Sequence, residues 1–150
     1  MTLAARRRRS SGFTLIELLV VVALIAIASG LASLALRDPT AAALEQEGAR
    51  LTALLESARA EARASGLAVR WEPRGTGAGT HDFRFVGLPD SNPLPERWLN
   101  EGVSAEVLGA RAVVLGPEPL IGAQRIMLSL EDHRLTLATD GLGPFEVRNE

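Results

Sequence analysis

The chain has 150 residues, a formal net charge of −2 at pH 7 and no cysteine. The lack of cysteine excludes disulfides and thiolate metal sites, so an exported domain of this chain must be held together by packing. All 16 basic residues are arginines, and the four at positions 6–9 precede every acidic residue. The chain after residue 12 has 12 arginines and 18 acidic residues, so its formal charge is −6. This acidic balance argues against a general nucleic-acid-binding surface.

Residues 1–12 form a short basic segment with four arginines and no acid. Short basic flanks of an apolar segment stay on the cytoplasmic side of a membrane, so the chain that follows is expected to be exported. An apolar run of 24 residues follows, from Phe13 to Leu36. As a helix this run would be about 36 Å long, against a hydrocarbon core of about 30 Å, and it is therefore long enough to span a bilayer.

A secretory signal peptide is the alternative interpretation of this amino-terminal segment, because it also has a basic start and an apolar stretch. A signal peptide has an apolar region of only about 7 to 15 residues that ends at a small-residue cleavage site. The run found here is longer and carries an acid near its start. Ala26, Ile27 and Ala28 nevertheless match the small-x-small cleavage pattern, so this alternative stays open.

Glu17 is the only ionisable side chain in the apolar run. A charge at the centre of a membrane helix costs at least about 2.5 to 3.5 kcal/mol, so such a residue usually marks a function. The cost is smaller near the start of the helix, where the partial positive charge of the helix amino end favours a carboxylate. A functional carboxylate is therefore predicted, the alternative being an acid that reaches the membrane edge and has no partner.

The segment from Gly12 to Glu17, GFTLIE, resembles the processing site of type IV pilins and type II secretion pseudopilins. By that resemblance a membrane peptidase cuts after Gly12 and methylates the new amino terminus, Phe13, and Glu17 falls at the fifth mature position, where the family keeps a glutamate. Cleavage would leave a cationic amine on Phe13. In a filament, the Glu17 carboxylate of one subunit would neutralise the Phe13 amine of a neighbour, so that neither charge stays unpaired in an apolar core. The expected role of Glu17 is therefore in subunit assembly.

A second helix is predicted over about residues 40–64. Pro39 is expected to interrupt the preceding helix, because it lacks a backbone donor and disfavours helical geometry at Asp38. Gly66 supplies a left-handed cap at the other end. The apolar face expected to pack on the globular domain has residues spaced by three and four, namely Leu44, Leu51, Leu54, Leu55, Ala58 and Ala62. The charged residues of the segment are expected to form a solvated face, namely Glu45, Glu47, Arg50, Glu56, Arg59 and Arg63.

After Gly66 the pattern alternates between apolar and polar residues, which predicts strands. They are expected around 67–71 and 83–85, and over 103–107, 112–115, 125–130, 134–139 and 145–148, with an antiparallel arrangement. The glycine-rich connection 73–80 lacks the Gly-Lys-Ser/Thr ending of a phosphate loop and is interpreted as a flexible hairpin loop. The proline-rich segment 88–98 cannot be a regular helix or a central strand, so it is a surface loop or a partner site. Trp98 in this segment is expected to fill the core.

No catalytic or metal-binding constellation stands out in the sequence. His81 and His133 are far apart and are expected to face solvent at strand ends, and neither an HExxH nor a GxSxG motif is present. Asp140 and Gly141 predict a tight turn, because the further acidic ligands of a calcium loop do not follow. We therefore expect no catalytic residue, no metal and no cofactor.

Four further segments resemble the H-type minor pseudopilins of type II secretion (GspH), namely 54–66, 94–99, 115–119 and 137–145. The resemblance implies an α+β, type IV pilin-like fold, in which the second half of a long amino-terminal helix packs on an antiparallel β-sheet or β-sandwich domain. It divides the chain into a leader peptide at 1–12, a transmembrane and assembly helix at 13–36, the periplasmic half of the helix at 37–65 and a periplasmic β domain at 66–150.

The same resemblance implies a structural subunit at or near the tip of the periplasmic pseudopilus, not an enzyme, that supports the export of folded proteins across the outer membrane. The expected partners are other minor pseudopilins, the major pseudopilin, the prepilin peptidase and the inner-membrane secretion platform. The expected location is a single pass through the bacterial inner membrane, with a cytoplasmic amino terminus and a periplasmic domain, and then the pseudopilus.

The alternative function is that of a minor type IV pilin in pilus biogenesis or DNA uptake, since those proteins share this leader and a similar domain. DNA-binding members tend to present a carboxyl-terminal cluster of arginines, whereas residues 143–150 contain one arginine and two acids. No nucleic-acid partner is therefore expected. A membrane-anchored periplasmic enzyme would need a catalytic motif, and none is found.

Overall fold

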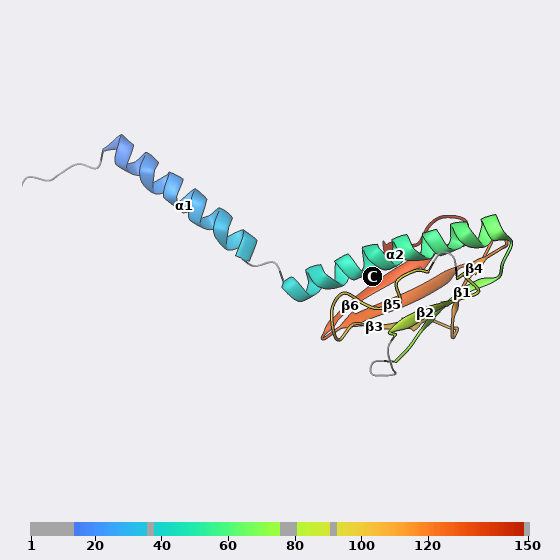
Figure 1. The fold of residues 1–150 in the computed structure, drawn as a ribbon. Coiled ribbons are helices and arrows are strands. Elements are labelled where there is room, and N and C mark those ends of the chain that lie inside the picture. The colour runs from blue at the N-terminus through green and yellow to red at the C-terminus, as the bar shows by residue number, and fades with distance from the viewer. Residues whose placement is uncertain (1–13, 36–37, 76–80, 91–92, 149–150) are drawn as a thin grey trace, which may run out of the picture. The chain divides into compact units, whose positions relative to one another are not determined.

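The computed structural model describes residues 14–35, 38–75, 81–90 and 93–148, with the side chains of residues 31–35 left out. The chain divides into two compact units, residues 1–37 and residues 38–150. In the described part of the first unit, helix α1 runs over Leu15–Ala35. The second unit holds helix α2 and two β-sheets (Figure 1).

Helix α2 runs over Pro39–Ser65, close to the predicted bounds. Asp38 has an extended backbone and caps the helix: its Oδ1 accepts hydrogen bonds from the N–H groups of Thr40 at 2.9 Å and Ala41 at 3.4 Å. Pro39 stands at the first helical position, where its fixed φ suits the helix and its missing N–H costs no hydrogen bond. Gly66 ends the helix in the left-handed conformation, with φ of 68°, as the sequence predicts.

The β domain contains seven strands within its described residues, and every pairing between them is antiparallel. A three-stranded sheet has the order β2-β1-β4, and a four-stranded sheet has the order β3-β5-β6-β7. The strands are β1 (Val69–Pro73), β2 (Phe83–Val86), β3 (Ser104–Val107), β4 (Val113–Gly116), β5 (Gln124–Leu130), β6 (His133–Thr139) and β7 (Glu146–Arg148). All the predicted strands are confirmed, although β1 begins two residues later than expected and leaves Leu67 exposed.

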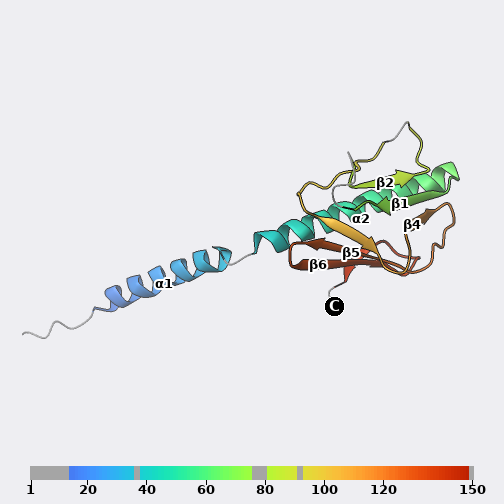
Figure 2. The same cartoon turned by 90° about the horizontal axis from the view of Figure 1, so that it is seen from below.

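The core lies between α2 and the two sheets, since α2 contacts β1 and β4 of one sheet and β5, β6 and β7 of the other (Figures 1 and 2). The predicted apolar face of α2 is buried, apart from Leu54, which is partly buried. Gly48 lies where α2 crosses β6, and a Cβ atom there would clash with Leu135. The missing side chain thus allows the helix to approach the sheet closely.

Large side chains of the three-stranded sheet fill the other part of the core. Trp71 and Phe83 are fully buried, with ring centroids 5.8 Å apart. Trp98 packs on Phe83 with centroids 4.6 Å apart and is partly buried against the core. Trp98 therefore closes the core from the side of the proline-rich loop, which agrees with its predicted role.

The prediction that the charged residues of α2 form a solvated face is wrong for two of them. Glu47 is fully buried and Arg59 is only 2% exposed. Burying an unpaired charge is costly, so each of these side chains must have partners elsewhere in the domain. Those partners lie on two loops far along the chain, at residues 99–100 for Glu47 and 141–143 for Arg59.

Candidate functional site

The first turn of α1 holds Glu17, the residue expected to act in assembly. The Oγ1 atom of Thr14, which precedes the helix, accepts a hydrogen bond of 3.3 Å from the Glu17 N–H. Thr14 and Glu17 have the Thr-x-x-Glu spacing of a capping box, in which a glutamate at the third helical position supports the helix start. The donor is the main-chain N–H of Glu17, so Thr14 caps the helix without a contact from the Glu17 side chain. This threonine cap is a local feature that the spacing could have indicated.

The Glu17 carboxylate makes no hydrogen bond or ion pair with any residue that the structure describes. Gly12 and Phe13, the expected cleavage and methylation residues, lie outside those residues. Their roles, and the pairing of Glu17 with a Phe13 amine, therefore stay predictions.

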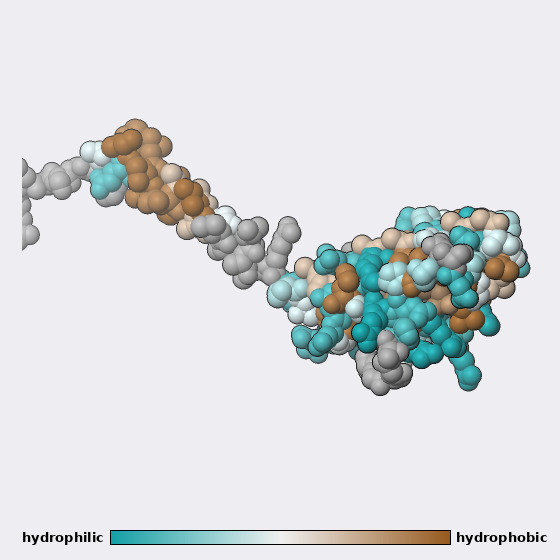
Figure 3. All heavy atoms as spheres, viewed as in Figure 1, coloured by the Kyte–Doolittle hydropathy of each residue, from teal (hydrophilic) through white to brown (hydrophobic). Residues whose placement is uncertain are grey.

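The side chains of α1 that the structure describes are exposed and mostly apolar, including Leu15, Ile16 and Leu24 at 77%, 66% and 60% exposure (Figure 3). Large contiguous apolar surfaces usually mark contacts with a membrane or another protein. No helix among the described residues proved long and apolar enough to cross a membrane. The span expected over residues 13–36 stays a prediction, because both of its end residues and the side chains of 31–35 lie outside the described part.

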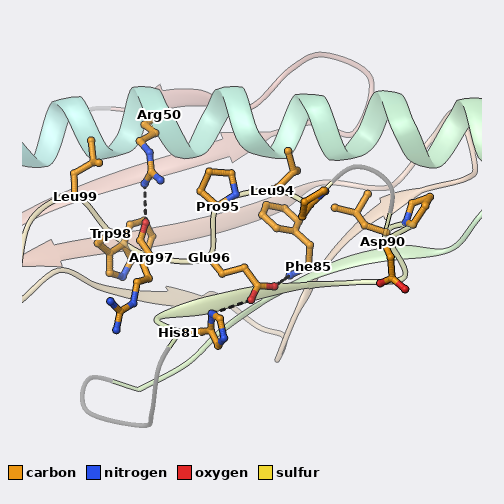
Figure 4. Close-up of a pocket in the computed structure, with 13 residues that line it drawn as sticks. Arg50, His81, Phe85, Asp90, Leu94, Pro95, Glu96, Arg97, Trp98 and Leu99 are labelled. Atoms are coloured by element: carbon orange, nitrogen blue, oxygen red, sulfur yellow. Dashed lines mark hydrogen bonds and ion pairs between the residues drawn. The ribbon is translucent and has the colours of Figure 1, made fainter.

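In the second unit, the described residues of the proline-rich loop line an open groove of about 810 Å³, together with Arg50 of α2 and Phe85 of β2 (Figure 4). We call it the loop groove. Its apolar lining includes Phe85, Leu94 and Trp98, and its polar lining includes Arg50 and Glu96. The described residues of segment 88–98 thus lie in a surface loop, one of the two interpretations of the sequence. Its role as a partner site stays a prediction.

Glu96 fastens the loop to β2. Its carbonyl oxygen accepts hydrogen bonds from the N–H groups of Asp82 at 2.9 Å and Phe83 at 3.3 Å. Its carboxylate accepts from the Phe85 N–H at 3.3 Å and pairs with His81 at 3.1 Å. These contacts occupy the outer edge of β2 and hold the loop in place.

Glu47 fastens the end of the same loop to α2. Its Oε1 accepts hydrogen bonds from the Leu99 N–H at 2.6 Å, the Asn100 N–H at 2.8 Å and the Asn100 side-chain amide at 3.1 Å. Its Oε2 lies 3.6 Å from Nη1 of Arg50, and that same Nη1 donates to the Arg97 carbonyl at 2.9 Å. The buried carboxylate therefore ties the loop and the helix into one rigid wall of the loop groove.

Arg59 fastens a second loop, residues 140–145, to α2. Its guanidinium donates to the carbonyl oxygens of Gly143 and Gly141, both at 2.8 Å. It also lies 3.9 Å from the carboxylate of Glu56, which accepts the Phe145 N–H at 3.2 Å. The planar guanidinium suits this arrangement because it presents several donors in a fixed geometry.

Asp140 begins this second loop with the tight turn that the sequence predicts. Its Oδ1 accepts hydrogen bonds from the N–H groups of Gly143 at 2.8 Å and Leu142 at 2.9 Å. These two backbone bonds, that of Gly143 first, hold the pKa of the Asp140 carboxyl below its ordinary value because they favour the charged form.

The two histidines lie apart, each paired with a carboxylate. His81 pairs with Glu96 and is 50% exposed, while His133, at 37% exposure, pairs at 2.8 Å with Asp38, the cap of α2. Both side chains are partly in contact with solvent, as predicted. Among the described residues, no group of three or more histidine, aspartate or glutamate side chains could hold a metal ion.

Comparison with known proteins gives two matches. Residues 7–33 match the family described as "Prokaryotic N-terminal methylation motif". The fold is similar to the crystal structure of the type IV minor pilin FimU of Pseudomonas aeruginosa, with a TM-score of 0.54, 14% sequence identity, and coverage of 71% of this chain and 88% of that chain. A search of curated proteins found no match.

The chain is therefore pilin-like in two independent respects. It carries a prepilin-type methylation motif at its amino terminus, and its domain has the type IV pilin fold, with a helix packed on antiparallel sheets. The predicted α+β fold is confirmed. A similarity at this level of identity establishes the fold, so the particular function rests on the arguments that follow.

Proposed function

We propose that the protein is a minor pseudopilin of a type II secretion system, a structural subunit at or near the tip of the periplasmic pseudopilus. In this role it is not an enzyme, and it supports the export of folded proteins across the outer membrane. The observation that carries the proposal is a pilin-like domain joined to a methylation motif. Its proposed partners are the prepilin peptidase, the secretion platform, the major pseudopilin and other minor pseudopilins.

In this proposal α1 anchors the subunit in the inner membrane, with its amino terminus in the cytoplasm and its β domain in the periplasm. The exposed apolar side chains of α1 support this role, because lipid or neighbouring helices would cover them. Entry into the filament would exchange the lipid around α1 for the helices of neighbouring subunits. The four arginines at positions 6–9 support the orientation, since basic flanks stay in the cytoplasm.

A minor type IV pilin is the second candidate, since the solved structure with a similar fold, FimU, is a type IV minor pilin. The acidic balance of the chain after residue 12 and the single arginine among residues 143–150 argue against the DNA-binding form of this candidate. The segments that resemble H-type pseudopilins favour secretion over pilus assembly.

Deletion of the gene in its native host separates the two candidates. The secretion proposal predicts that folded exoproteins accumulate in the periplasm while surface pili and DNA uptake stay at wild-type levels, and that the full-length gene restores secretion. Loss of pili or of DNA uptake with normal secretion would replace this proposal with the minor pilin.

The proposed assembly role of Glu17 depends on its charge, so glutamine at this position is the matched control. Glu17→Gln keeps the size and polarity of the side chain but removes its charge, whereas Glu17→Ala removes both. Both variants keep the main-chain N–H that Thr14 caps. If the carboxylate neutralises the Phe13 amine of a neighbour, both variants enter the filament poorly. Normal filament entry of Glu17→Gln, measured in sheared filament fractions, would contradict the proposed charge pairing.

The loop groove is the proposed contact with another minor pseudopilin. Exchanging residues 88–95 for an unrelated segment of equal length is expected to abolish co-purification with that partner. Glu96 and Trp98 are kept because they hold the loop to β2 and close the core. Exchange of residues 108–112, a turn that does not line the groove, serves as the control. Unchanged co-purification after the first exchange would exclude the loop as the partner site.

A further inference from the structure

Both edges of the three-stranded sheet are occupied by polar groups of a single residue, Glu96 on β2 and Gln124 on β4. On β2, Glu96 accepts the Phe85 N–H through its carboxylate and the Phe83 N–H through its carbonyl oxygen. On β4, the side-chain amide of Gln124 accepts the Val114 N–H at 2.8 Å and donates to the Val114 carbonyl at 2.9 Å. Closed edges of this kind prevent the addition of a further strand.

The four-stranded sheet differs at one end. Its strand β3 contacts β1 of the other sheet, whereas β7 is the last strand at the opposite end. Within the described residues, β7 pairs only with β6, and no side chain or loop bonds to its outer edge. Glu146, Val147 and Arg148 are all exposed. The backbone N–H and C=O groups on that edge are therefore available to an incoming strand.

The start of β7 is held firmly by α2. Phe145, the residue before the strand, is 1% exposed and donates its N–H to Glu56. Arg59 holds the two carbonyl oxygens of the preceding loop, as described above. A preformed edge binds a strand at a lower entropy cost than a mobile segment would. The two charged side chains of α2 thus position β7 before any partner arrives.

The side chains of β7 determine which residue types an added strand needs at the opposite positions. Val147 lies opposite the buried Leu137, so it belongs to the face of the sheet that α2 covers. Glu146 and Arg148 belong to the outer face, and Arg148 lines a hollow there together with Thr136 and Ala138. An antiparallel strand would need a base opposite Glu146, an apolar residue opposite Val147 and an acid opposite Arg148, because like charges directly opposite destabilise a pair.

We propose that the outer edge of β7 is a docking edge for an extended segment of a neighbouring subunit, and that this segment adds an antiparallel strand with the order acid, apolar residue, base. This mode of binding combines backbone hydrogen bonds for affinity with alternate side chains for specificity. That the occupant is a neighbouring subunit rests on the proposed function. The strand-accepting edge and its charge preference rest on the geometry of β7 alone.

Disulfide tethering tests this edge in the full-length chain, purified in detergent micelles. The chain has no cysteine, so Val147→Cys introduces a single thiol at the centre of the edge. The probe is a synthetic peptide of residues 144–150 with the same Val147→Cys change, which has the required order of acid, central residue and base. Residues directly opposite in antiparallel strands have Cα atoms about 4.5 to 5.5 Å apart, within the range of a disulfide.

The measurement is the fraction of protein that captures peptide at equilibrium in a glutathione redox buffer. We expect capture of this peptide to exceed that of a peptide with Glu146→Arg and Arg148→Glu by about fivefold, because two cross-strand charge pairs change from attractive to repulsive. The same two substitutions in the protein should invert the preference. Leu120→Cys, which is 64% exposed outside the strands, is the control and should show no preference between the peptides.

Equal capture of the two peptides at Val147→Cys, or a preference that does not invert, would overturn the proposal. A preference of the same size at Leu120→Cys would also overturn it, because it would reflect general charge attraction. None of these readouts depends on cleavage, methylation or secretion. The docking edge and the proposed function can therefore fail separately.

Discussion

Glu47 offers the sharpest test of how α2 shapes the loop groove. Replacing it with alanine removes a fully buried carboxylate that accepts three hydrogen bonds from Leu99 and Asn100. It also leaves the Arg50 guanidinium without its partner at 3.6 Å. Two elements that are 52 residues apart in the sequence lose their main polar connection.

The expected loss follows from these contacts. Removing a fully buried carboxylate from a charged network costs about 3 to 5 kcal/mol, because the part-buried donors of Leu99 and Asn100 lose their acceptor and a cavity is left under the loop. For a domain of this size that loss corresponds to a fall in Tm of roughly 10 to 25 °C. Glu47→Gln keeps an acceptor oxygen and the shape of the side chain, so its expected cost is roughly 1 to 2 kcal/mol.

Thermal unfolding of the full-length chain in detergent micelles, followed by circular dichroism and by tryptophan fluorescence, provides the measurement. Trp98 lies in the loop groove, so its fluorescence also reports release of the loop. Glu45→Ala is the matched control, since Glu45 lies on the same helix but is exposed, and its effect should stay within about 0.5 kcal/mol. A loss below about 1 kcal/mol for Glu47→Ala would refute the view that this carboxylate fastens the loop.

Three further substitutions test other parts of the fold. Arg59→Ala should cost about 3 to 5 kcal/mol in urea unfolding, because two carbonyl oxygens lose a buried donor, whereas the exposed Arg63→Ala should cost under about 0.5 kcal/mol; equal losses would contradict this. Gly87→Ala should lower the yield of folded protein, because Gly87 has φ of 96° and a Cβ atom there would clash with the Ala68 carbonyl; wild-type stability would contradict the backbone geometry. The lowered pKa of Asp140 means that its contribution to stability is present above the ordinary aspartate pKa and is lost as the pH falls through the lower, folded-state value. Asp140→Asn should therefore be less stable than the wild type at pH 6, and the difference should narrow as the pH falls below about 4; a difference that is constant with pH would contradict this.

Local patterns in the sequence are sufficient to predict helix α2 and the strands of this fold. The three-and-four spacing of α2, its Asp38 and Gly66 caps and the alternation in each strand depend on neighbouring residues, and the structure confirms them to within one or two residues. Leu67 departs from the pattern because Gly66 in the left-handed conformation precedes it. The pairing of β1 with β4 begins only at Val69, and its pairing with β2 begins at Arg70.

The burial of two charged residues of α2 could not be predicted from the sequence. Glu47 and Glu45 are two residues apart and chemically identical, yet one is buried and the other exposed. The difference comes from loop N–H groups more than 50 residues away, and no periodicity predicts that contact. The same holds for Arg59, whose carbonyl partners lie more than 80 residues further on.

The amino-terminal motif can be found from the sequence because its residues are contiguous. The segment from Gly12 to Glu17 contains the expected cleavage point, the expected methylated residue and the carboxylate within six residues. Residues 7–33 match the methylation motif, whereas the roles of Gly12, Phe13 and Glu17 stay predictions. The Thr14 cap uses the main-chain N–H of Glu17, so it gives no local reason for a glutamate side chain at this position.

The intact mass of the protein, taken from an inner-membrane preparation that contains its native prepilin peptidase, shows most directly whether it is processed as a pilin-class subunit. We expect the loss of residues 1–12 and the gain of one methyl group on Phe13. An uncleaved chain would indicate a plain membrane anchor, and cleavage near Ala28 would indicate an ordinary exported protein. Either of these results would contradict the assignment of a pilin-like subunit and the assembly role proposed for Glu17.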